Sequence, residues 1–86
     1  FNKSAIGNIL GDAARYLGIS GGFDGFCNYV DELNASLGIP KNLTGLGITK
    51  PDVERIVEGA LIDPSTGGNP VAMTKENTTK LLLEII

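Results

Sequence analysis

The 86-residue sequence contains no histidine and no tryptophan, and its only cysteine is Cys27. Without histidine the commonest metal ligand is missing, and a single cysteine can form neither an internal disulfide nor a cysteine-based zinc site. The chain therefore carries no transition-metal cage built from histidine or cysteine side chains.

The sequence also has no excess of positive charge and no long apolar run. Seven basic residues stand against ten acidic ones, which gives a net charge of −3, and the basic residues are scattered. The sequence therefore has no stripe of basic residues that could contact the phosphates of a nucleic acid, and we do not expect nucleic acid as a partner. No stretch approaches the roughly eighteen apolar residues of a membrane span, and no signal peptide is evident. We expect no membrane association and a cytoplasmic location.

Apolar residues, by contrast, make up 42% of the chain. So short a domain buries only about 60% of the surface that its unfolded chain exposes. The composition therefore indicates apolar faces that contact something outside these residues. The chain opens on Phe1 without an initiating methionine, and we expect a fragment or a processed product.

Two stretches in the first half of the chain repeat apolar residues at helical spacing. The first runs from Ile6 to Leu17, and Gly18 stands where a C′ glycine would end a helix. The second is the clearest amphipathic helix, closed by Gly38 before Pro40. Its apolar stripe comprises Phe23, Phe26, Cys27, Val30, Leu33 and Leu37.

Residues 41–48 are too short and too rich in glycine for a strand, and they predict a tethered loop with apolar anchors at Leu43, Leu46 and Ile48. A helix start follows, because Thr49 can cap it and Asp52 occupies the position where a capping box places an acid. The apolar stripe of this helix comprises Val53, Ile56, Val57, Ala60 and Leu61.

Thr74 predicts the cap of a last helix that stays helical to the end of the chain. One face of that helix carries Thr78, Leu81, Leu82, Ile85 and Ile86. Four helices joined by short loops that glycine and proline close predict an all-α fold without strands.

Residues 63–70, with the sequence DPSTGGNP, separate the last two helices. Two prolines and two adjacent glycines cannot extend either helix. Asp63, Ser65, Thr66 and Asn69 can bond their own backbone, which is typical of a shaped loop. A plain connector between helices has the same composition, so the residues alone leave both interpretations open.

Other candidate sites are weak. Neither Gly21-Gly22 nor Gly67-Gly68 leads into the Gly-Lys-Ser/Thr of a phosphate loop. Carboxylate pairs such as Glu54 and Glu58 lie on solvated helix faces. No base, nucleophile and orienting group occur together, so the chain lacks a self-contained active site.

Three separated signatures resemble, in order, the C-terminal end of iron-containing (group III) alcohol dehydrogenases. They are LGIP at residues 37–40 with Leu43 following, Gly47-Ile48, and DPSTGGNP at residues 63–70. In that family the last turn reads D-x-C/S-T-G-G-N-P and precedes a Thr-capped final helix. The likeness extends over nearly all 86 residues, while Val71 departs from the arginine that commonly follows the turn.

The resemblance implies a two-domain parent enzyme, with an N-terminal domain for NAD(P) and a helical domain for a divalent metal, usually iron, held by Asp and His. Residues 1–86 would be the C-terminal part of the helical, metal-side domain. Phe1-Asn2 resembles the end of the helix that follows the last ligand histidine. The nucleotide-binding domain and the metal ligands would then lie outside this chain.

The same resemblance implies roles in the turn. Ser65, where many members have cysteine, would line the substrate cleft together with Thr66. The residues that would shape the turn are Asp63, Gly67, Gly68, Asn69 and Pro70. The chain itself would supply no catalytic, cofactor-binding or metal-binding residue.

The leading hypothesis is thus a C-terminal segment of an NAD(P)-dependent, iron-type alcohol dehydrogenase. Its parent would interconvert a small alcohol and its aldehyde or ketone, and the isolated chain would be inactive. The expected partner is the missing N-terminal part of the parent, and a homo-oligomer stays open. The alternative is a free-standing helical interaction module without enzymatic activity, whose apolar surplus serves a partner surface.

Overall fold

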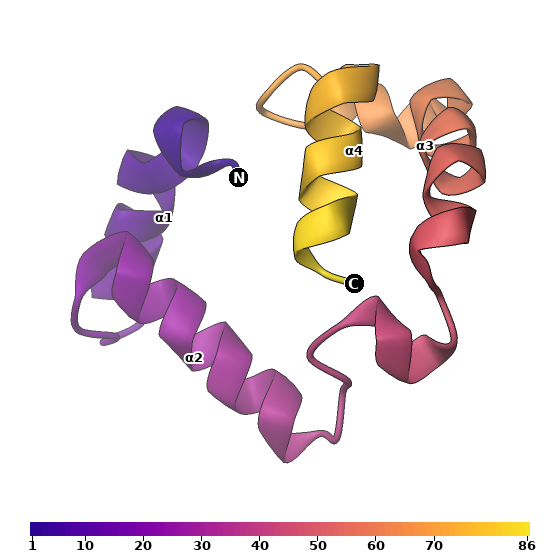
Figure 1. The fold of residues 1–86 in the computed structure, drawn as a ribbon. Coiled ribbons are helices and arrows are strands. Elements are labelled where there is room, and N and C mark those ends of the chain that lie inside the picture. Colours follow the sequence, from indigo (N-terminus) through magenta and orange to yellow (C-terminus); the bar gives the residue numbers. More distant parts are fainter. The chain divides into compact units, whose positions relative to one another are not determined.

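Only helices and their connections occur in the computed structural model, which describes residues 1–86 (Figure 1). The four α-helices are α1 (Lys3–Tyr16), α2 (Gly22–Ser36), α3 (Val53–Ile62) and α4 (Lys75–Glu84). Three short 3-10 helices lie between them: η1 (Leu43–Leu46), η2 (Lys50–Asp52) and η3 (Pro64–Gly68). The prediction of an all-α chain with four helices is confirmed.

The chain divides into two compact units, Phe1–Ile39 and Pro40–Ile86. The division follows Gly38, which has a φ of 72° and ends α2 as predicted. The amide of Gly38 donates to the carbonyl of Ala35, and that of Ile39 donates to the carbonyl of Asn34. Pro40 has no amide with which to continue this pattern.

In the first unit, α1 and α2 form a helical hairpin. α1 begins at Lys3, three residues before the predicted start, and its end matches the prediction because Gly18 adopts a φ of 75°. The tight connection depends on Gly25, where a Cβ atom would lie 1.8 Å from the carbonyl oxygen of Ser20. Ala14 is the only buried residue of this unit, so its core is very small.

The second unit begins with a tethered turn. Residues predicted as an anchored loop form η1, whose start is capped by Asn42 Oδ1 accepting from the Gly45 amide at 3.3 Å. The amide of Leu43 donates to the carbonyl of Ile85 at 2.7 Å. This bond ties the loop to the end of the chain, and Leu43 packs against the core as predicted, whereas the predicted anchor Leu46 is 64% exposed.

The capping box predicted at Thr49 is present, and the cap predicted at Thr74 belongs to a second capping box that the sequence analysis did not predict. Asp52 Oδ2 accepts from the amide and from the hydroxyl of Thr49, each at 3.0 Å. These two bonds, the amide first, lower the pKa of the Asp52 carboxyl. Thr74 Oγ1 accepts from the Asn77 amide at 3.2 Å, and Asn77 Oδ1 accepts from the Thr74 amide at 2.8 Å.

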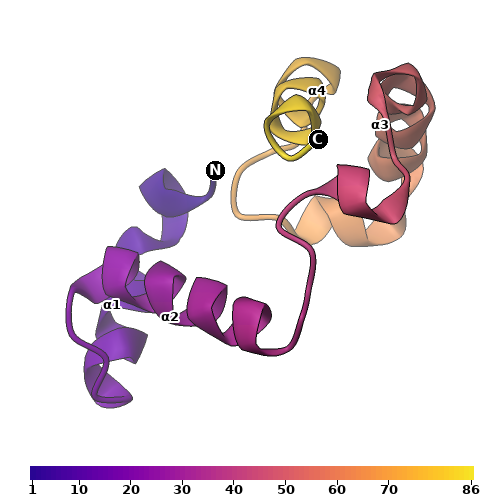
Figure 2. The ribbon, with the colours of Figure 1, turned by 60° about the horizontal axis from the view of Figure 1, so that its bottom comes forward.

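The core of the second unit lies between α3 and α4, which run side by side in Figures 1 and 2. It consists of Val53, Val57 and Leu82, with Val57 fully buried. The residues packed against it are Leu43, Ile56, Leu61 and Ile86. The last helix was predicted to reach the chain end, but α4 stops at Glu84. Ile86 thus reaches the core from outside the helix.

None of the helices combines the length and the apolar character that crossing a membrane requires.

Candidate functional site

The DPSTGGNP turn folds as η3 between α3 and α4. Asp63 ends α3 in an extended conformation, and its Oδ1 accepts from the Ser65 amide at 2.7 Å. Pro64 occupies the first position of the 3-10 helix, where its missing amide costs nothing. The local chemistry of Asp63 and Pro64 therefore turns the chain sharply out of α3.

Two further side chains fix the turn from within. Thr66 Oγ1 donates to the carbonyl of Ala60, in the last turn of α3, at 2.5 Å. Asn69 Nδ2 donates to the carbonyl of Val71 at 2.6 Å and lies 3.4 Å from Met73 Sδ. The turn is therefore a shaped loop held at both ends, which favours that interpretation over a plain connector.

The glycine pair of the turn has a different role from the one that its composition suggested. Positive φ values occur at five glycines elsewhere in the chain, but not at Gly67 or Gly68. A Cβ atom at either position would meet nothing within 4 Å. The backbone of this turn therefore does not need glycine, and the pair leaves one side of η3 open to its surroundings.

A groove of about 570 Å³ opens beside the turn. Ser65 lines it with an exposed side chain, and its hydroxyl makes no hydrogen bond within the chain. Thr66 lines it too, although its hydroxyl proton is already engaged by Ala60. The remaining residues of this groove are Ala60, Asp63, Gly68, Asn69, Pro70 and Met73.

The structure thus places six of the seven predicted turn residues around one groove and leaves Gly67 out of its lining. Sequence reasoning missed Ala60 and Met73. The missed residues lie outside the motif, three residues before it and three after it. Ala60 belonged to the predicted apolar stripe of α3, but nothing in its spacing marked it as part of a groove.

We predict that Thr66→Val loosens the turn. Valine keeps the shape of threonine but removes the donor to Ala60, which costs about 1 kcal/mol. Amides of the turn should then exchange hydrogen about fivefold faster in the full-length parent. Thr44→Val is the matched control, because Thr44 is exposed and its hydroxyl makes no bond in the chain. Equal exchange in both variants would contradict the anchoring role of Thr66.

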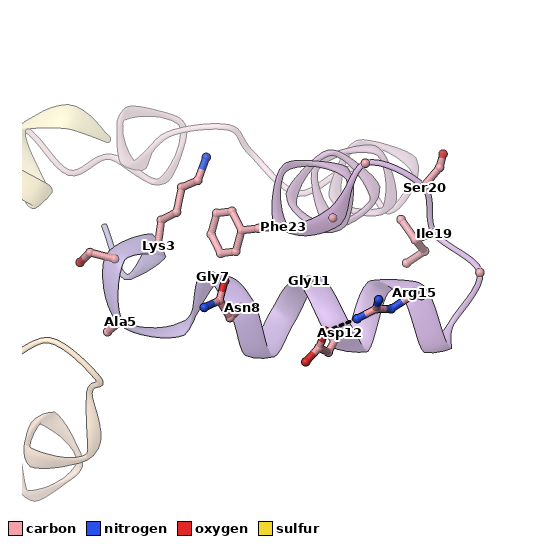
Figure 3. A pocket seen from close by; sticks show the side chains of 14 residues that line it. Lys3, Ala5, Gly7, Asn8, Gly11, Asp12, Arg15, Ile19, Ser20 and Phe23 are labelled. Carbon is pink, nitrogen blue, oxygen red and sulfur yellow. Dashed lines mark hydrogen bonds and ion pairs between the residues drawn. The ribbon is translucent and has the colours of Figure 1, made fainter.

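A second, larger groove of about 1080 Å³ lies along α1 and the start of α2 (Figure 3). Its cations are engaged by carboxylates, because Lys3 Nζ lies 2.8 Å from Asp24 Oδ1 and Arg15 pairs with Asp12. The Lys3 ammonium also lies 5.5 Å from the centre of the Phe23 ring. These pairings leave neither cation free for an anion, although Gly21 and Gly22 line the groove.

Potential metal ligands do not gather into a cluster in this chain. No group of three or more potential ligands among aspartate, glutamate, cysteine and histidine comes together in residues 1–86.

Comparisons with known proteins agree on one family. The whole chain, residues 1–86, matches the profile described as "Fe-containing alcohol dehydrogenase family, C-terminal". It is 31% identical over 90 residues to the lactaldehyde reductases of Escherichia coli K12 and of Escherichia coli O157:H7. Each match covers 94% of this chain but only 23% of the relative. No solved structure matches the chain significantly. The chain belongs to the Fe-containing alcohol dehydrogenase family, of which it corresponds to the C-terminal part.

Proposed function

We propose that residues 1–86 form part of the substrate side of an NAD(P)-dependent, iron-type alcohol dehydrogenase. The parent enzyme would interconvert a small alcohol and its aldehyde or ketone by hydride transfer. The observation that carries this proposal is the groove beside η3, which the family's turn motif lines with the unpartnered hydroxyl of Ser65. The family match over the whole chain supports it.

The residues of the turn would orient the substrate without doing chemistry. Ser65 would offer a hydroxyl that can donate to, or accept from, a substrate oxygen. Asp63, Thr66 and Asn69 would hold that hydroxyl in place, because each is hydrogen-bonded to the backbone of the turn or its flanks. Rigid support of this kind is what a positioning residue needs.

Small, hydroxylated substrates suit this groove. It combines the polar Ser65 with the apolar Ala60, Pro70 and Met73, and such a mixture can hold a short carbon chain with one or two oxygens. The matched relatives are named lactaldehyde reductases, which favours a short hydroxyaldehyde or the corresponding diol as the substrate of the parent.

The metal and the nicotinamide would be held by parts of the parent outside residues 1–86, because these residues offer no ligand cluster. When bound, the metal would polarise the substrate oxygen and the nicotinamide would exchange hydride. The isolated chain is accordingly expected to be inactive. Its partner in catalysis would be the preceding part of the same polypeptide.

The function is tested with the full-length parent purified with Fe²⁺ and supplied with NAD⁺ or NADP⁺. We expect reduced cofactor to form with short diols and primary alcohols, and activity to disappear after chelation and return with metal. The same assay on residues 1–86 alone should give no turnover. A parent that oxidises none of these alcohols, or turnover by the isolated chain, would contradict the proposal.

A further inference from the structure

Met73 is the largest apolar side chain that lines the groove beside η3, and it is half-buried. The other apolar residues of the lining, Ala60 and Pro70, are small or rigid. A methionine has three rotatable bonds and usually adapts its shape to whatever it contacts. A methionine that is held in one position would instead act as a fixed wall of the groove.

The backbone at Met73 is held from both sides by one residue of α4. Asn77 Nδ2 donates to the carbonyl of Ala72 at 2.9 Å, and Asn77 Oδ1 accepts from the amide of Thr74 at 2.8 Å. The residues before and after Met73 are therefore both bonded to the first turn of α4, and this fixes where the Met73 side chain leaves the backbone.

The thioether of Met73 is held as well. Asn69 Nδ2 lies 3.4 Å from Met73 Sδ, and a thioether sulfur is a weak hydrogen-bond acceptor. The same nitrogen donates to the Val71 carbonyl at 2.6 Å, and this bond sets the orientation of the amide. Asn69 thus connects the DPSTGGNP turn to a side chain outside it, and Met73 has less freedom than its three rotatable bonds would give it.

We propose that Met73, together with Ala60, forms the apolar wall that limits how long a carbon chain the parent enzyme accepts. The inference rests on the proposed function and extends it, because that function gives the class of the substrate and not the residue that limits its length. Ser65 would bind a substrate oxygen, and the Ala60 methyl and the Met73 thioether would contact the far end of the carbon chain. One methylene more or less in an apolar pocket changes kcat/KM by about tenfold or more.

The test compares kcat/KM for 1-hexanol with kcat/KM for 1-propanol in the full-length parent. Met73→Ala should raise the hexanol-to-propanol ratio at least about tenfold, because the shorter side chain leaves room for additional methylenes. Ala60→Val adds two methyl groups to the same wall and should lower the ratio. Met73→Leu conserves the volume of the side chain and should keep the ratio close to that of the wild type.

Leu83→Ala is the matched control, because Leu83 is 46% exposed and does not line this groove. It shortens an apolar side chain of similar size and should leave the ratio unaltered. Equal ratios in the wild type, Met73→Ala and Ala60→Val would overturn the inference, and so would a shift in the same direction in both variants, which is what a general loosening of the turn would produce. A wild-type parent that oxidises no alcohol would refute the proposed function instead.

A measurement without turnover tests the wall in a parent of any activity. The methionine methyl groups are labelled with carbon-13, Fe²⁺ is exchanged for diamagnetic Zn²⁺, and the Met73 signal is the one that Met73→Leu removes. Titration with 1-propanol should shift this signal more than titration with methanol, whose single carbon is too short to reach Met73. A Met73 signal that no alcohol moves would overturn the inference. A shifted signal in an inactive parent would refute the proposed function and leave the wall standing.

Discussion

Gly25→Ala is expected to disrupt the α1–α2 hairpin. The added Cβ atom would lie 1.8 Å from the Ser20 carbonyl oxygen and 2.8 Å from its carbon, distances that no relaxed structure tolerates. The connection around Ser20 and Gly21 would have to move, at a cost of about 3 kcal/mol. Amides of α1 and α2 should then exchange hydrogen about a hundredfold faster in the full-length parent.

Gly7→Ala provides the matched control for this prediction. Gly7 lies inside α1, and a Cβ atom there would meet only the flexible Lys3 side chain, with Cγ at 3.6 Å. Alanine in a helix interior is favoured over glycine by about 1 kcal/mol, so this variant should be slightly more stable. Unchanged exchange in Gly25→Ala would contradict the close packing at the connection.

Val57→Asp should unfold the second unit. Val57 has no exposed surface and lies among Val53 and Leu82. An aspartate there would bury a carboxylate without a partner, which costs at least about 4 kcal/mol. Because Thr66 is anchored on the carbonyl of Ala60 in α3, the substrate groove should be lost as well. The parent should therefore lose both its α3–α4 protection from hydrogen exchange and its alcohol oxidation.

The same kind of substitution at an exposed position shows how much of the destabilisation is due to burial. Ile62 ends the same helix and is 84% exposed. Ile62→Asp should change the stability by no more than about 0.5 kcal/mol. If Val57→Asp were as stable as Ile62→Asp, the core assigned to α3 and α4 would be wrong.

Most helix boundaries could be predicted because their causes are local. Gly18 and Gly38 end α1 and α2 with positive φ values, and glycine adopts these readily. Thr49 and Thr74 start their segments through bonds to residues three positions ahead. Such bonds connect neighbours in the sequence, so residue type and spacing are enough to predict them.

Features that depend on the path of the folded backbone or on packing between helices could not be predicted. The importance of Gly25 arises from the Ser20 carbonyl across a turn, and the sequence does not show that approach. The division of the chain after Ile39 depends on which helices pack together, namely α1 with α2 and α3 with α4. α4 ends before Ile85, where the Ile85 carbonyl instead accepts from the Leu43 amide.

The candidate site came from a resemblance, since composition alone could not separate a shaped turn from a connector. The structure adds the hydrogen bonds of Asp63, Thr66 and Asn69, and it brings Ala60 and Met73 into the groove. It also changes the explanation of Gly67 and Gly68. Neither glycine has a positive φ, and what they contribute is the open space beside the turn.

The role of Ser65 in the substrate cleft is tested most directly by the substrate preference of the full-length parent carrying Ser65→Cys. The account predicts that the ratio of kcat/KM between a diol and an alcohol without a second hydroxyl changes several-fold, with unfolding shifted by less than about 0.5 kcal/mol. Ser36→Cys makes the same change at an exposed position of α2 and should leave this kcat/KM ratio unaltered. Identical ratios in the wild type and in Ser65→Cys across a series of alcohols would contradict the account.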